Sequence, residues 1–171
     1  MPDISLAAWA NIAEIIGAGG LISGLIFGLF QIRQYRSQQR DAVAINLAQT
    51  FYSKDLARAL ALLRPLPDGI SLKDMQGLGE EYVEAAITVT TSFETMGMLV
   101  HKRIAQLDLV LDLAGGIITV MSRKLHQWHQ DMRKAQKQPS WGEWFEWLAD
   151  QANAAKNARE PAHVRFRDWK P

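Results

Sequence analysis

The sequence predicts an all-α protein in which one N-terminal transmembrane helix continues into a cytoplasmic helical bundle with a long antiparallel helix hairpin. The first observation is that the 18 residues 15–32, IIGAGGLISGLIFGLFQI, include no ionisable side chain. A helix of that length spans roughly 27 Å, close to the roughly 30 Å hydrocarbon core of a bilayer. The second is that apolar residues further along recur every three or four positions, the period of packed helices. We expect a membrane segment over 1–40 with its span at about 10–32, a bundle over 41–157 and an extended or disordered tail over 158–171.

Two other interpretations of the apolar segment are disfavoured. A cleaved signal peptide carries its positive charges before the apolar run, whereas here Asp3 and Glu14 precede the run. A buried core helix rarely continues for 18 residues without a charge. The positive-inside rule places the basic side in the cytoplasm and the N-terminus outside. The juxtamembrane residues on that side are Gln31, Arg33, Tyr35, Arg36 and Arg40.

Composition limits the compartment and the partners. With 19 basic and 18 acidic residues the net charge is +1, so no overall field favours nucleic acid, and we expect no nucleic-acid partner. The sequence holds no cysteine, which excludes disulfides, thiolate zinc sites and cysteine nucleophiles. It also holds no Asn-x-Ser/Thr glycosylation site. We therefore expect a protein of the bacterial inner (cytoplasmic) membrane with the bulk of the chain in the cytoplasm.

Glycines recur along one face of the apolar segment. Gly20, Gly24 and Gly28 are each four residues apart, and Gly17 lies nearly in line with them. In a bilayer, small residues at this spacing let another helix approach closely. Glycine is also frequent in membrane helices that do not associate, but three in register favour a helix-packing face. The expected partners are the lipid bilayer and either further copies of the chain or a larger membrane complex.

Capping residues and helix breakers delimit the bundle helices. The first helix continues to about residue 52, and a second runs over 54–63 with Ser53 as its N-cap. Residues 71–79 form a connector with at most one short turn of helix. The two long helices cover 80–102 and, capped by Asp108, 108–136; the short link between them predicts the antiparallel hairpin. Gly115 and Gly116 would let a neighbouring backbone come close.

A capping box at Ser140 to Glu143 predicts a last helix over 141–157. Large apolar side chains line one face of this helix at i, i+3, i+4 and i+7. We expect this aromatic face to close the bundle by covering it, and a partner-binding surface is the alternative. Its residues are Trp141, Trp144, Phe145, Trp147 and Leu148.

Five short motifs occur in an order that resembles a family of small bacterial single-span membrane proteins classed as a domain of unknown function. They lie at Gln31–Gln34, Phe51–Ser53, Phe93–Gly97, Asp108–Leu113 and Trp144–Leu148, and Phe-Glu-x-x-Gly is the most specific of them. The resemblance covers most of residues 10–150. It implies a single span and a helical fold, and it brings no catalytic residues.

Two carboxylates are candidates for buried polar sites. Glu94 lies on the inward stripe of its helix, where a carboxylate needs a partner because an unpaired buried charge is costly. Asp112, in the first turn of its helix, is expected to meet the helix dipole or the hairpin. A structural ion pair is favoured for Glu94, with a titrating or substrate-binding acid as the alternative. Its candidate partners are Arg58, Arg103 and Arg123.

Neither a metal site nor a catalytic motif stands out. His126 and His129 lie one helical turn apart, but Arg133 occupies the next turn, where a third ligand would be needed. Phosphate-binding glycine loops, nucleophile elbows and paired-carboxylate helix motifs do not occur. We therefore expect no metal, no cofactor and no enzymatic activity.

The leading expectation for function is a membrane-anchored interaction or scaffold protein. It would self-associate, or serve as an accessory subunit of a larger membrane complex, through the glycine face. One alternative is a homo-oligomeric pore, which the scarcity of polar residues in the span disfavours. A less favoured alternative is a membrane-surface enzyme that uses Glu94.

Overall fold

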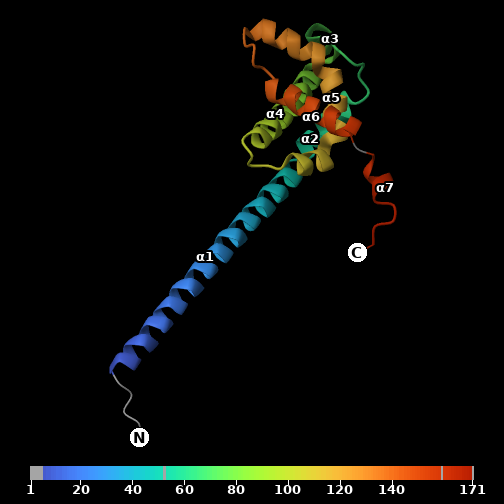
Figure 1. The fold of residues 1–171 in the computed structure, drawn as a ribbon. Helices are drawn as coiled ribbons and strands as arrows, with labels where there is room; N and C mark the ends of the chain where they lie inside the picture. The colour runs from blue at the N-terminus through green and yellow to red at the C-terminus, as the bar shows by residue number, and fades with distance from the viewer. Residues whose placement is uncertain (1–5, 52, 159, 171) are drawn as a thin grey trace. The chain divides into compact units, whose positions relative to one another are not determined.

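The computed structural model describes the backbone of residues 6–51, 53–158 and 160–170; in the first helix, the side chains at 6–13, 15–16, 18, 36–41 and 43–44 lie outside the described residues. All regular structure in the described ranges is helical, which confirms the predicted all-α class (Figure 1). The helices are α1 (Leu6–Phe51), α2 (Lys54–Leu63), α3 (Leu72–Leu78), α4 (Glu80–His101), α5 (Leu107–Gln136), α6 (Glu143–Ala158) and α7 (Ala162–Arg165).

The chain divides into two compact units, residues 1–42 and 43–171. Helix α1 runs unbroken through the predicted membrane segment to Phe51, so the predicted continuation of this helix is confirmed. Large apolar side chains between Leu21 and Ile32 are exposed all around it. Among the described residues, however, no helix combines the length with the apolar character that crossing a membrane requires.

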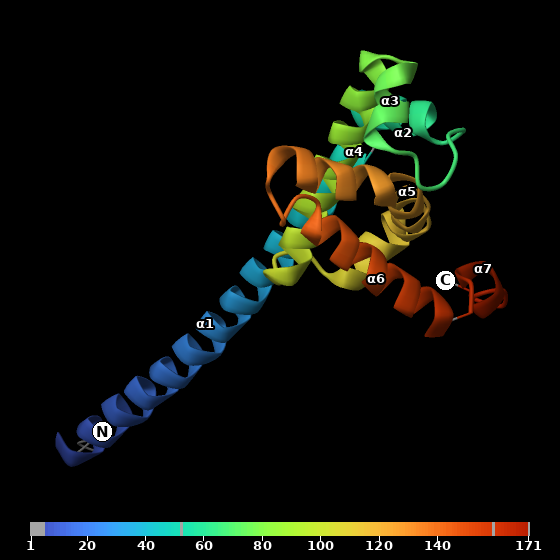
Figure 2. The same cartoon turned by 90° about the horizontal axis from the view of Figure 1, so that it is seen from above.

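Helix α4 is the central element of the second unit. It packs most extensively against α2 and α6, and less against α3 and α5. Its buried side chains recur at helical spacing, as Ala86, Val89, Phe93 and Val100. Figure 2 shows α6 beside both α4 and α5, and the core forms where these three helices meet.

The predicted hairpin of α4 and α5 is not the main packing unit. The two helices are joined by a short link in which Arg103 has φ +58°. Yet the larger interfaces join α2 to α4, α4 to α6 and α5 to α6, whereas α4 and α5 make a smaller one. The reason is the apolar face of α6, which buries Phe145 and Leu148 completely against its neighbours.

Most of the predicted helix boundaries hold, with one change of capping residue. The Ser53 side chain accepts a hydrogen bond from the Leu56 N–H at 3.3 Å, as the N-cap of α2. Helix α5 begins at Leu107, with Gln106 at its N-cap position, so the assignment of Asp108 as the cap is wrong. Asp108 lies instead in the first turn, where a negative charge is favourable to the helix dipole.

The last long helix begins two residues later than predicted, at Glu143. Gly142 has φ +70°, a left-handed conformation that interrupts the helix and favours glycine. Ser140 accepts the Glu143 N–H through its backbone carbonyl at 3.2 Å, instead of through the side chain of a capping box. The connector contains the two-turn helix α3, where at most one short turn was predicted. The tail contains the single turn α7, which was not predicted because the tail sequence has no apolar period.

Candidate functional site

The apolar segment of α1 is the candidate interaction surface of the first unit. A Cβ atom placed on Gly17, Gly20, Gly24 or Gly28 would meet no heavy atom within 4 Å. These glycines define the glycine face, a strip of α1 without side chains that lies between exposed large side chains. The exposed neighbours are Leu21, Ile22, Leu25, Ile26, Phe27, Leu29, Phe30 and Ile32.

The juxtamembrane residues follow directly on this segment. Gln31, Arg33 and Tyr35 are exposed on α1. Arg36 and Arg40 belong to the same predicted group, but their side chains lie outside the described residues.

Glu94 has a different partner from those predicted. Its Oε2 accepts a hydrogen bond from the backbone N–H of Phe145 at 2.8 Å. Phe145 is in the first turn of α6, where backbone N–H groups have no partner within the helix and the helix dipole favours an anion. Glu94 therefore caps a helix 51 residues away in sequence, and no arginine contact is needed to explain its half-buried position.

Asp112 is exposed, not buried as predicted. Because α5 begins at Leu107, Asp112 lies in the second turn of the helix. It borders a cavity between α2 and α5.

The aromatic face of α6 lies against the bundle. Phe145 is fully buried, and its ring centroid is 5.1 Å from that of Phe93 on α4. The Trp144 ring lies against His101 at the end of α4, tilted by 41° with 4.4 Å between ring centroids. Of the tryptophans predicted for this face, Trp144 and Trp147 lie on α6, whereas Trp141 lies in the turn before it, and all three are half-buried.

A buried polar cluster joins α4, α5 and α6. His129 is 0% exposed, and its Nε2 lies 3.0 Å from the hydroxyl of Thr90. Its Nδ1 lies 3.8 Å from Oε1 of Glu146, longer than a hydrogen bond. The other oxygen of Glu146 accepts a 2.8 Å hydrogen bond from Nη2 of Arg133, whose Nε donates to the backbone carbonyl of Trp141.

The electrostatics of the cluster centre on one carboxylate. The His129 ring and the Arg133 guanidinium beside it lower the pKa of Glu146 from 4.5 to about 2, although burial acts to raise it. Glu146 is thus ionised at neutral pH. The negative charge of Glu146 facing Nδ1 of His129 favours a proton on that nitrogen, while Nε2 makes the hydrogen bond with the Thr90 hydroxyl.

The order hydroxyl, imidazole, carboxylate is also that of hydrolytic triads. Here, however, Thr90 is 2% exposed and His129 is fully buried beside Phe145 and Trp128. A nucleophile must reach its substrate, and this hydroxyl does not reach solvent. In this arrangement the cluster is a structural tie between three helices.

Sequence reasoning missed this cluster because it considered His129 only as a metal ligand beside His126. The two rings approach the same oxygen of Glu146, with Nδ1 of His126 at 3.9 Å and Nδ1 of His129 at 3.8 Å. They differ in burial, because His126 is exposed and lies 2.9 Å from the side-chain amide of Gln130. The described residues contain no group of three or more His, Cys, Asp or Glu side chains able to hold a metal ion. The signal that could have been used was Thr90, a polar residue on the inward stripe of α4.

Comparison with known proteins identifies the family. No curated protein and no solved structure matches the chain. A family match confirms the resemblance to a domain-of-unknown-function family that the five motifs indicated. Because this match runs over residues 18–152, more than half of the chain, the protein belongs to the family described as the domain of unknown function DUF4760.

Proposed function

We propose that the protein is a membrane-anchored interaction or scaffold protein. Residues 15–32 of α1 would cross the bacterial inner membrane, with the N-terminus outside and the bundle in the cytoplasm. The glycine face would pack against further copies of the chain or against a subunit of a larger membrane complex.

One observation carries the proposal: eight large apolar side chains between Leu21 and Ile32 are 51–71% exposed around a single helix. Leaving them in water forgoes on the order of 10 kcal/mol of burial. That is comparable to the whole stability of a typical domain, about 5–15 kcal/mol. A helix that is apolar on all sides needs lipid or protein around it.

The sequence supplies the rest of the support for a membrane span. The uncharged run extends from Ile15 to Ile32. Arg33 follows it directly and is the first of three arginines on the side that the positive-inside rule assigns to the cytoplasm.

The absence of cysteine from the sequence makes a direct test of the glycine face available. Single cysteines placed in turn at residues 17–32 would be oxidised in native membranes, and disulfide-linked dimers would be measured. We expect maxima at Gly20, Gly24 and Gly28, with minima at residues on the opposite side of the helix. Uniform or absent cross-linking would exclude self-association through this face. Packing against a subunit of a larger membrane complex would then be the remaining form of the proposal.

Membrane insertion is tested separately. The full chain should stay in the membrane fraction on alkaline extraction. A reporter protein that is active only in the cytoplasm should be active when it is fused to the C-terminus. Release of the chain by alkali would contradict the span.

A further inference from the structure

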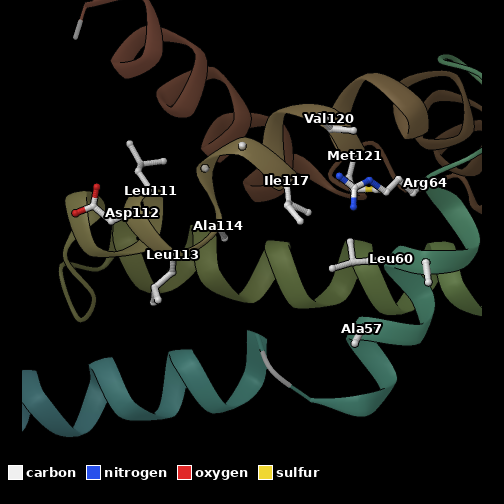
Figure 3. Close-up of a pocket in the computed structure, with 13 residues that line it drawn as sticks. Ala57, Leu60, Arg64, Leu111, Asp112, Leu113, Ala114, Ile117, Val120 and Met121 are labelled. Atoms are coloured by element: carbon white, nitrogen blue, oxygen red, sulfur yellow. The ribbon is translucent and has the colours of Figure 1, made fainter. Parts of the chain in front are cut away.

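A cavity of about 570 Å³ lies between α2 and α5, within the second unit (Figure 3). Its volume is in the range of small-molecule binding sites, about 300–1,000 Å³. The wall is mostly aliphatic, and the side chains that form it come from both helices. The larger ones are Leu60, Leu111, Leu113, Ile117, Val120 and Met121.

Two glycines keep the α5 wall of this cavity open. Gly115 and Gly116 lie inside a 30-residue helix, where glycine is destabilising unless close packing uses the missing side chain. A Cβ on Gly116 would meet nothing within 4 Å, and one on Gly115 would meet only Leu111 of the same helix. The prediction that a neighbouring backbone approaches this pair is therefore wrong. The described structure leaves the space beside the pair empty.

The cavity has a cation at one end. Arg64 ends α2, and Figure 3 shows its guanidinium directed toward Met121 and Ile117, whereas the carboxylate of Asp112 points away from them. Among the described residues, the Arg64 side chain has no carboxylate oxygen within 4.0 Å and no hydrogen-bond partner within 3.5 Å. A guanidinium binds carboxylates and phosphates through paired N–H donors.

We propose that this cavity binds a single-chain amphiphile with an anionic head, in which the acyl chain lies along the aliphatic wall and the head contacts Arg64. A fatty acid and a lysophospholipid share this chemistry. The proposal does not rest on the membrane span, because all the residues that form the cavity belong to the bundle.

The test uses the full chain in native membranes and a photoreactive palmitic acid as the probe. After irradiation, labelled peptides are mapped by mass spectrometry. We expect labelling within residues 57–64 and 111–121, which unlabelled palmitate or lysophosphatidylglycerol in excess removes. Whichever competitor acts at lower concentration identifies the source of the ligand.

Two pairs of variants separate binding from general damage. Gly116→Leu fills the open wall, and Gly77→Leu is its control, because Gly77 is also a helical glycine with nothing within 4 Å. Arg64→Gln removes the cation, and Arg58→Gln removes an exposed arginine of the same helix outside this cavity. We expect Gly116→Leu and Arg64→Gln each to reduce labelling about tenfold, and the controls to leave it unchanged.

A photoreactive fatty alcohol of the same chain length tests the role of charge. It should label the cavity equally in the native chain and in Arg64→Gln. Labelling confined to α1, or a reduction by Gly77→Leu as large as that by Gly116→Leu, would overturn the proposal. If Gly116→Leu does not fold, the Arg64→Gln chain decides alone. Labelling of Arg64→Gln by the photoreactive palmitic acid as strong as that of the native chain would also overturn the proposal.

Discussion

Replacing Gly97 by alanine should disrupt the close approach of α4 and α6 at this residue. The new Cβ would lie 2.2 Å from the backbone carbonyl oxygen of Trp144 and 2.8 Å from its carbonyl carbon. A separation of 3.0 Å requires α6 to move by at least 3.0 − 2.2 = 0.8 Å, since a backbone carbonyl has no rotamer that relieves the clash. That shift would also disturb the Glu94 to Phe145 hydrogen bond, which is 2.8 Å long.

The magnitude follows from two opposing effects. Overpacking in a core costs about 1–3 kcal/mol, and alanine recovers up to about 1 kcal/mol of helix propensity over glycine. Because the contact is with backbone, we expect the upper part of the overpacking range and a net loss of about 2 kcal/mol. This corresponds to a fall in Tm of roughly 5–10 °C for a unit of this size.

The matched control is Gly116→Ala, the same change in a helix where the new Cβ meets nothing. It should stabilise the bundle by up to about 1 kcal/mol through propensity alone. Unfolding of the full chain in mild detergent, followed by tryptophan fluorescence in guanidinium, measures both variants. Equal effects of the same sign in the two variants would refute the assignment of Gly97 as the close-packing glycine.

Three further predictions concern the polar contacts of the bundle. Glu94→Ala should lower the free energy of unfolding by about 1–2 kcal/mol and speed amide exchange in the first turn of α6, and Glu94→Gln should have an intermediate effect. A Glu94→Gln chain that keeps the native stability but loses a cellular function would instead favour a membrane-surface enzyme that uses Glu94. Thr90→Val should cost about 1–3 kcal/mol, because it leaves Nε2 of His129 buried without a partner, and a neutral effect in urea unfolding would contradict the tie. Glu146 has a pKa of about 2 in the fold against 4.5 ordinarily, so its ionised form stabilises the fold above pH 4.5, and this contribution is lost as the pH falls through 2. The stability difference between the native chain and Glu146→Gln, on the order of 1–3 kcal/mol at pH 7, should therefore shrink below pH 4.5, and a constant difference would argue against this charge.

Local signals predicted the helices well. The apolar period and the Ser53 cap are encoded within a few residues, so α2 begins and ends where the sequence indicated. The predicted start of α6 was two residues too early because Gly142 adopts φ +70°. This glycine packs beside His129, a residue distant in sequence, and a Cβ at Gly142 would lie 3.4 Å from the nearest ring atoms of His129.

Contacts between distant segments could not be predicted in the same way. The partner of Glu94 is a backbone N–H in α6, and no side-chain pattern marks a backbone group as a partner. Gly97 and Gly116 are both glycines within helices, yet one packs against a neighbouring backbone and the other borders a cavity. Only the arrangement of the neighbouring helices distinguishes them.

The central claim is that α1 anchors the chain in a membrane and assembles through its glycine face. The most direct test is the mass and subunit composition of the complex extracted from native membranes in mild detergent. We expect an assembly larger than one 19.2 kDa chain, which Gly24→Leu dissociates and Gly19→Leu, a change on another face of the helix, leaves intact. A single chain recovered outside the membrane fraction, or an assembly that Gly24→Leu leaves unchanged, would contradict the account.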